Sequence, residues 1–202
     1  MTSLPRVVLA TRNEHKVVEI RRILADAGAP VDLVAVSDIP GVGDVVETGV
    51  TFHENALLKA RTVAAAAELP ALAEDSGIAV AVLNGMPGVF SARWSGRHGD
   101  DVANLQLLLD QLGDVPDEHR GAAFVSVAAL VAPDGHEVVE EGAVHGRLTR
   151  EPRGGNGFGY DPIFVPDGAS RTTGEMSDAE KDAVSHRGRA FRAIAPHVTA
   201  LR

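Results

Sequence analysis

Two adjacent carboxylates interrupt an apolar stretch near the middle of the chain. Residues 74–77 read Glu-Asp-Ser-Gly, directly after the apolar residues 70–73 and directly before the apolar residues 78–82. A carboxylate in an apolar frame needs a cation, a proton or several hydrogen-bond donors, because uncompensated burial of a charge is costly. The chain must therefore fold so that compensating groups reach this segment, and a metal-assisted active site would supply them.

The alternative is that Asp75, Ser76 and Gly77 form only a polar turn between two short strands, since these residue types favour turns. If the strand stays extended, Glu74 and Asp75 lie on opposite faces, and if the chain turns, both lie at the strand's end. Their hard oxygen atoms suit Mg²⁺, which usually keeps several waters and shares its coordination with substrate phosphates.

Length and charge limit the classes of protein to consider. With 202 residues and 45% hydrophobic residues, we expect a single domain over residues 1–202 with one substantial core or two closely joined lobes. The 28 acidic residues outnumber the 19 basic ones, which gives a net charge of −9. This charge argues against a nucleic-acid partner and against an anionic membrane surface, so any anionic ligand must be met locally.

The chain has no cysteine, which excludes disulfides, thiolate zinc sites and cysteine nucleophiles. The N-terminal residues lack the features of a signal peptide, and no apolar stretch approaches the ~20 residues needed to cross a bilayer. We therefore expect a cytoplasmic location.

Periodicity predicts an α/β fold with a mixed sheet flanked by helices. Apolar runs predict strands over residues 6–10, 31–36, 71–73, 78–82 and 122–131, with a further strand pair around residues 137–147. Helices are expected after residue 13, from 51 through 67, over 101–112 and from 177 onwards, and residues 51–54 and 177–180 have the form of capping boxes. The alternating start followed by a long hairpin favours a mixed sheet over a purely parallel one.

The turn at residues 11–16 leaves a strand and enters a helix, where free N–H groups and the helix dipole favour an anion. Asn13 and Lys16 could hold phosphate oxygens there. Alternatively, Asn13 is an ordinary helix cap and Lys16 is solvated. The spacing is not that of a Walker A loop.

In the second predicted helix, Asn55 and Lys59 are four residues apart and so share one face, with Glu47 just upstream. An amide, an ammonium and a carboxylate suit a site for phosphate and metal. The competing interpretation is a solvated surface stripe.

A glycine-rich segment at residues 154–162 contains Phe158, Tyr160 and Asp161. Glycines let the backbone approach a ligand closely, and an aromatic face can stack on a nucleobase. Lys181 and residues 185–188 (Ser-His-Arg-Gly) could donate to the carbonyl oxygens of a base. Taken singly, a glycine-rich segment is most often only a loop, and a His-Arg pair most often lies on the surface.

Together these segments resemble the inosine triphosphate pyrophosphatase family, the dITP/XTP diphosphatases, almost from end to end. The resemblance rests on residues 9–19 (Leu-Ala-Thr-x-Asn-x-x-Lys-x-x-Glu), 47–61 (Glu-Thr-Gly-x-Thr-Phe-x-Glu-Asn-Ala-x-x-Lys-Ala-Arg), 74–77, 87–93 (Pro-Gly-x-x-Ser-Ala-Arg), 157–162 (Gly-Phe-Gly-Tyr-Asp-Pro) and 185–188. So many ordered motifs at family-like spacing are highly specific.

The resemblance implies two α/β lobes around a central substrate cleft, usually in a homodimer. It also implies Mg²⁺-dependent hydrolysis of ITP, XTP and dITP to the monophosphate and pyrophosphate, which clears damaged purines from the nucleotide pool. Asp75 would be the general base, and the metal would be held by Asp75, Glu74 or Glu47, ranked with Asp75 first and Glu74 next. The implied substrate-binding residues are Thr11, Arg12, Asn13, Glu14, His15, Lys16, Lys59, Ser76, Phe158, Gly159, Tyr160, Asp161, Lys181, His186 and Arg187.

Two positions depart from the family pattern. Arg12 stands where bacterial members have glycine, and either adds a phosphate contact or points into solvent. Glu74 stands where some members have aspartate.

Two other functions compete with this one. The first is a Maf-type pyrophosphatase for modified pyrimidine nucleotides, against which residues 157–161 and 186–187 argue. The second is a nucleotide sensor without turnover, against which Asp75, Lys16 and Lys59 argue.

Overall fold

The computed structural model describes residues 4–201 and contains six strands and five α-helices in that part of the chain. In chain order they are β1 (Arg6–Leu9), α1 (Glu14–Asp26), β2 (Asp32–Ala35), α2 (Phe52–Ala67), β3 (Ala71–Val80), α3 (Asp101–Gln111), β4 (Gly121–Val131), β5 (Glu137–Leu148), β6 (Phe164–Pro166), α4 (Asp178–Val184) and α5 (His186–Thr199). None of the helices in the described part is long and apolar enough to span a membrane.

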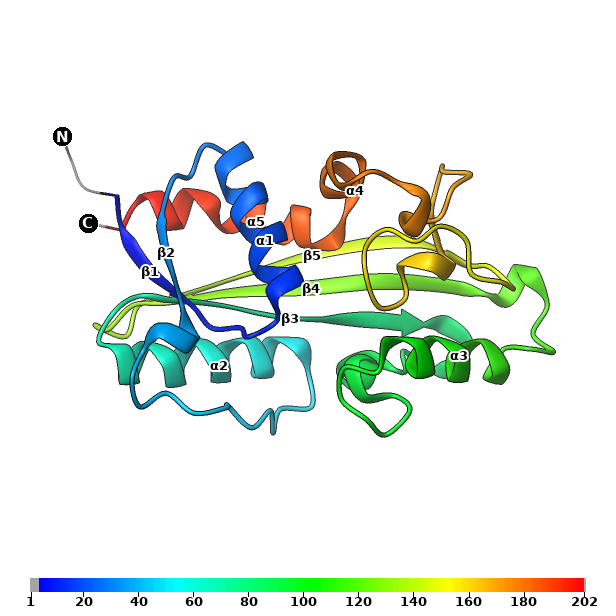
Figure 1. The fold of residues 1–202 in the computed structure, drawn as a ribbon, viewed down its shortest axis with the longest axis horizontal. Helices are drawn as coiled ribbons and strands as arrows, with labels where there is room; N and C mark the ends of the chain where they lie inside the picture. Colours follow the sequence, from blue (N-terminus) through cyan, green and yellow to red (C-terminus); the bar gives the residue numbers. More distant parts are fainter. Residues whose placement is uncertain (1–3, 202) are drawn as a thin grey trace. The chain divides into compact units, whose positions relative to one another are not determined.

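The six strands form one mixed sheet in the order β2-β1-β3-β4-β5-β6. Figure 1 labels β1 to β5. β1 runs parallel to β2 and to β3, with Val8 opposite Val34 and Ala71. β5 and β6 are antiparallel, with Arg147 opposite Val165. The predicted α/β fold with a mixed sheet is therefore confirmed.

The chain divides into two compact units. Unit 1 contains the described residues up to Asp75, Ser126–Gly142 and the residues from Arg187 onwards, and unit 2 contains Ser76–Val125 and Ala143–His186. The strands β3, β4 and β5 each contribute residues to both units. The single domain and the substrate cleft stay predictions.

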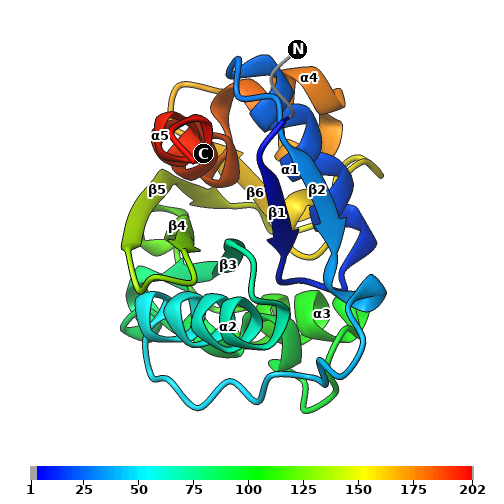
Figure 2. The same ribbon diagram turned by 90° about the vertical axis from the view of Figure 1, so that its left-hand side faces the viewer.

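In unit 1, α1 and α5 cover one face of the strands and α2 covers the other (Figure 2). Because successive side chains of a strand point to opposite faces, Leu72 packs in the cluster with α1 and α5, whereas Ala71 and Ala73 pack in the cluster with α2. The same alternation assigns Glu74 to the α1 and α5 face and Asp75 to the α2 face.

In unit 2, α3 packs on the ends of the long strands. Leu105 and Leu108 of α3 share a buried cluster with Ile78 and Val80 of β3. Phe124 of β4 belongs to the same cluster, and its ring meets the ring of Phe164 edge-on, with centroids 4.6 Å apart. This packing fixes unit 2 on its own apolar core.

The structure corrects the sequence prediction at the acidic segment. β3 runs without interruption from Ala71 to Val80, so the predicted break between two short strands is wrong, and so is the polar turn. A Cβ atom at Gly77 would collide with the side chain of Ser91, so this glycine permits a close approach of backbone rather than a turn. β5 is likewise one strand where a pair was expected, while both capping boxes are confirmed.

Candidate active site

The turn between β1 and α1 begins the site in unit 1. Asn13 caps α1, since its Oδ1 accepts from the backbone N of Lys16 at 3.2 Å, and Thr11 Oγ1 accepts from the N of Asn13 at 3.2 Å. The capping alternative is thus confirmed for Asn13, but Lys16 is not simply solvated. Its side chain is 17% exposed, and its Nζ lies 2.9 Å from Glu74 Oε2.

Arg12 extends away from this turn. Its guanidinium donates to the carbonyl oxygen of Val42 at 2.9 Å and pairs with Asp44 at 2.7 Å, so it holds the glycine-rich segment after β2. Glu14 and His15 are exposed on the first turn of α1.

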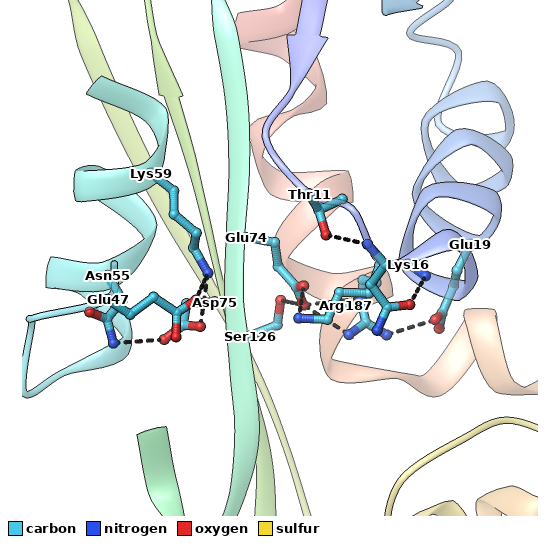
Figure 3. Close-up of polar contacts among 11 residues, drawn as sticks. Thr11, Lys16, Glu19, Glu47, Asn55, Lys59, Glu74, Asp75, Ser126 and Arg187 are labelled. Atoms are coloured by element: carbon cyan, nitrogen blue, oxygen red, sulfur yellow. Dashed lines mark hydrogen bonds and ion pairs between the residues drawn. The ribbon is translucent and has the colours of Figure 1, made fainter. Parts of the chain in front are cut away.

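Glu74 is held by a buried network on the α1 and α5 face (Figure 3). Arg187 Nε donates to Glu74 Oε1 at 3.0 Å, and Arg187 Nη1 donates to Glu19 Oε2 at 2.6 Å. Ser126 Oγ donates to Glu74 Oε1 at 2.9 Å. Burial alone would lower the pKa of Arg187, but the charges of Glu74 and Glu19 raise it above its ordinary value. This guanidinium therefore stays charged between its two carboxylates.

Asp75 meets a different set of groups on the α2 face (Figure 3). Its Oδ1 accepts from Lys59 Nζ at 3.0 Å and its Oδ2 accepts from Asn55 Nδ2 at 3.3 Å. Lys59 Nζ also donates to Glu47 Oε1 at 2.7 Å. Asn55 and Lys59 are one helical turn apart, which is why both reach the same carboxylate.

The charges on this face do not fully compensate Asp75. Burial raises the pKa of Asp75 and Glu47 adds to the effect, so the pKa stays above its ordinary value although Lys59 and Lys16 lower it. For Lys59, burial lowers the pKa, but Asp75 and Glu47 outweigh it and the net change is upward. A buried carboxylate with a raised pKa beside a protonated lysine is a good candidate for a general base.

Glu47 and Asp75 on the α2 face are the candidate ligands for a divalent cation. Glu47 and Asp75 both point a carboxylate at the ammonium of Lys59, so their oxygens converge on one positive group. Within residues 4–201, no cluster of three or more Asp, Glu or His side chains that could hold a metal is found. Two carboxylates suit Mg²⁺, which leaves most of its coordination to waters and phosphates. The structure does not bring Glu74 to this pair.

In unit 2, Asp161 organises the predicted base-binding segment. Lys181 Nζ donates to Asp161 Oδ2 at 2.8 Å and lies 4.9 Å from the centroid of the Phe158 ring. The same Asp161 oxygen accepts from the N of Phe158 at 2.9 Å, while Thr173 Oγ1 donates to Asp161 Oδ1 at 2.8 Å. Phe158, Asp161 and Lys181 are thus brought together as predicted, with the aromatic ring beside a cation.

Two neighbours of Phe158 have structural partners. The N of Gly159 donates to Asp101 Oδ2 at 2.9 Å, and the hydroxyl of buried Tyr160 donates to the carbonyl oxygen of Ser91 at 2.8 Å. Burial raises the pKa of Tyr160 well above its ordinary value, so this phenol stays protonated. These contacts fix the loop that carries the Phe158 ring.

His186 and Arg187 are neighbours in the motif at residues 185–188, but they belong to different units and have different partners. His186 belongs to unit 2, where its ring stacks on Phe124 with centroids 4.7 Å apart and planes inclined by 10°. Arg187 belongs to unit 1 and contacts Glu19 and Glu74 there. Ser76, the first residue of unit 2, is half-buried.

Glu19, Ser126 and Thr173 contact these residues but were not among the predicted site residues, whereas Asn55 was expected beside Lys59. Glu19 and Ser126 leave a signal in the sequence. Glu19 lies on the apolar face of α1 beside Ile20 and Ile23, and Ser126 is the polar residue within the apolar run of β4. A polar residue at such a position needs a buried partner.

Fold and site together define an α/β protein with a mixed sheet and a buried cluster of lysine and carboxylate groups beside β3. Residues 7–197 match the model of the Ham1 family. The chain belongs to the Ham1 family, which confirms the resemblance found in the motifs.

Relatives and solved structures agree with this assignment. The dITP/XTP pyrophosphatase of Streptomyces coelicolor is 59% identical over 198 residues, covering 98% of this chain and 99% of the relative. The crystal structure of the nucleoside-triphosphatase / dITP/XTP pyrophosphatase from Mycobacterium abscessus matches with a TM-score of 0.78 at 56% identity, covering 95% of this chain and 99% of that one. A HAM1 protein from Coxiella burnetii matches with a TM-score of 0.87 at 40% identity, covering 97% and 99%.

Proposed function

We propose that this protein hydrolyses the nucleoside triphosphates ITP, dITP and XTP to the monophosphate and pyrophosphate, and so removes damaged purines from the nucleotide pool. The observation that carries the proposal is the buried Asp75 carboxylate, which has a raised pKa and contacts both Lys59 and Asn55. The names of the relatives, dITP/XTP pyrophosphatases, support the choice of substrates.

The reaction follows from the groups of unit 1. A water attacks the α-phosphorus and gives its proton to Asp75, while the bond from that phosphorus to the bridging oxygen breaks and pyrophosphate leaves. Lys16 and Lys59 supply positive charge for the phosphate oxygens, and Thr11 and Asn13 lie at the helix N-terminus, where anions are favoured.

A divalent cation is part of the proposal. Glu47 and Asp75 would hold Mg²⁺, which when bound neutralises charge on the phosphate oxygens. Glu74 is assigned no ligand role, because Arg187, Lys16 and Ser126 occupy its oxygens.

Unit 2 would supply the selection of the base. The ring of Phe158 would stack on the purine, and Lys181 and His186 would donate to its carbonyl oxygen. An adenine would present an amino group instead and leave a buried donor without a partner, which is unfavourable. The contact of Arg187 with the purine stays a prediction. In the structure this residue is 1% exposed, and its guanidinium contacts two carboxylates. A homodimer in the cytoplasm is proposed from the resemblance alone.

The test is to incubate the purified protein with Mg²⁺ and each of ITP, XTP, dITP, ATP, GTP and dTTP, and to identify both products. Pyrophosphate and monophosphate from only the first three is the expected result. Turnover of pyrimidine triphosphates would favour the Maf-type alternative. Tight binding without turnover would favour a nucleotide sensor.

A further inference from the structure

Asn55 is the second hydrogen-bond partner of Asp75, and the fold buries it completely. It lies in the first turn of α2 with a side chain that is 0% exposed. Its Nδ2 donates to Asp75 Oδ2 at 3.3 Å, and its Oδ1 accepts from the backbone N of Gly49 at 2.8 Å. Both ends of the amide are therefore used inside the protein.

The contact with Gly49 fixes which way the amide points. The N–H of Gly49 requires an acceptor, so the oxygen of Asn55 faces Gly49 and its NH₂ group faces Asp75. A Cβ atom on Gly49 would lie 2.6 Å from Asn55 Oδ1 and 2.6 Å from Glu54 Cβ, so only glycine allows this approach. Glu54 Oε2 also accepts from the N of Val50 at 2.7 Å, which ties the same segment to the helix.

Asn55 and Lys59 divide the carboxylate of Asp75 between them. Lys59 contacts Oδ1 and Asn55 contacts Oδ2. A single donor would leave the carboxylate free to rotate about its Cβ–Cγ bond, whereas one donor on each oxygen fixes its plane. Asn55 also holds Gly49, two residues after Glu47, so one amide connects Asp75 to the segment that carries the second carboxylate.

We infer that Asn55 is a positioning residue, which fixes the plane of the Asp75 carboxylate and attaches the Glu47 segment to it. The inference rests on the proposed function and names the side chain that orients its general base. Asn55 itself touches Asp75 rather than the reacting atoms, so its removal must act through Asp75.

The experiment compares wild type, Asn55→Ala, Asp75→Asn and the double variant, each with Mg²⁺ and ITP. Loss of positioning is expected to lower kcat of Asn55→Ala by about tenfold to a hundredfold, with KM near the wild-type value. In the Asp75→Asn background, Asn55→Ala is expected to lower kcat no further. A multiplicative loss in both backgrounds, or a rise in KM alone, would overturn the inference.

Asn104→Ala is the matched control. Asn104 is 1% exposed, lies in α3 of unit 2, and accepts from the N of Ser95 at 2.7 Å. Its removal also deletes a buried amide that holds a backbone N–H, so it should lower the melting temperature while kcat stays near wild type. An equal fall in kcat for this control would show that any loss of a buried amide suffices, and would overturn the inference.

Asn55→Asp keeps the test informative if Asn55→Ala does not fold. It retains the shape and the acceptor for Gly49, but turns an oxygen instead of a donor toward Asp75, so kcat should fall in a folded protein. Urea unfolding of the four-protein set in EDTA gives a readout without substrate, and non-additive effects of Asn55 and Asp75 are expected there. If wild type hydrolyses none of the three purine triphosphates, the proposed function fails, whereas additive unfolding effects refute the positioning role.

Discussion

Glu74 and Asp75 are neighbours in one buried strand, yet their surroundings differ on the two faces of β3 (Figure 3). Glu74 has Arg187, Lys16 and Ser126 around its two oxygens. Asp75 has one lysine, which it shares with Glu47, and one neutral amide. Glu74 thus lies against two cations and a hydroxyl, while Asp75 keeps a raised pKa.

Under the proposed function, β3 carries a structural carboxylate, Glu74, and a reactive carboxylate, Asp75, side by side. The alternation of side chains sends them to opposite faces, so each can have its own set of charges. Burial and the nearby charge of Glu47 raise the pKa of Asp75, so this carboxylate accepts a proton more readily than an ordinary aspartate does. In the proposed reaction, Asp75 is therefore the reactive member of the pair.

The largest effect on activity is expected when the carboxylate of Asp75 is removed. Asp75→Asn should lower kcat by about 10²- to 10⁴-fold, the usual range for loss of a general base. The fold should be retained or stabilised, because the variant removes a buried charge with an unfavourable environment. Initial rates with ITP and a urea unfolding curve measure both. Activity close to that of wild type would end the assignment of Asp75 as the base.

Breaking the buried network around Glu74 should instead destabilise the fold. Arg187→Met leaves Glu19 and Glu74 without their shared guanidinium, and loss of one partner from a buried ion pair costs about 3 to 5 kcal/mol of unfolding free energy. Urea denaturation of the variant measures this loss.

A triple variant serves as the control for Arg187→Met. Adding Glu19→Gln and Glu74→Gln removes the stranded charges, so most of the stability should return. If Arg187→Met alone is as stable as wild type, the network does not hold this face together.

A smaller effect is expected when pH changes the difference in stability between wild type and Asp75→Asn. Because the folded pKa of Asp75 lies above its unfolded value of 3.8, the folded state binds more protons between the two values. The stability of wild type relative to Asp75→Asn should therefore be highest below the unfolded value, fall as the pH rises through this window, and stay constant above the folded pKa.

Urea unfolding of both proteins across a pH series in EDTA tests whether the stability of wild type relative to the variant falls as the pH rises. Titrating groups that do not interact with Asp75 contribute alike to both proteins and cancel in the difference, which therefore reports Asp75 together with Glu47 and Lys59, whose charges are coupled to it. If wild type instead gains stability over the variant as the pH rises, then the hydrogen-bond donors and cations around Asp75 have a larger effect on its pKa than burial has.

Local rules predicted much of the α2 face. A capping box involves four residues, and Asn55 and Lys59 share a face because they are one turn apart, so these features are readable from a short segment. The continuity of β3 was not readable, because the charges that permit it come from far away in the chain. Arg187, for example, is separated from Glu74 by 113 positions.

The side-chain partners of His186 and Arg187 in the motif at residues 185–188 were not readable from the sequence, for a related reason. Adjacent residues in a sequence motif suggest a shared role, but His186 and Arg187 begin α5, where consecutive side chains point about 100° apart. His186 stacks on Phe124, and Arg187 contacts Glu19 and Glu74. Only the packing of the helix decides which neighbour each side chain meets.

The smallest effect on stability is expected from removing the N-terminal cap of α2. This change separates the contribution of the first helical turn from that of Asn55, which lies in it. Thr51 Oγ1 accepts from the N of Glu54 at 3.1 Å, so Thr51→Ala should cost about 1 kcal/mol of unfolding free energy. Ser177→Ala removes the equivalent cap of α4 in unit 2 and is the matched control. Because Asn55 and Gly49 keep their own hydrogen bond, kcat should remain near wild type in both variants. A fall in kcat for Thr51→Ala as large as that for Asn55→Ala would assign the orientation of Asp75 to the whole first turn of α2, and not to the amide of Asn55.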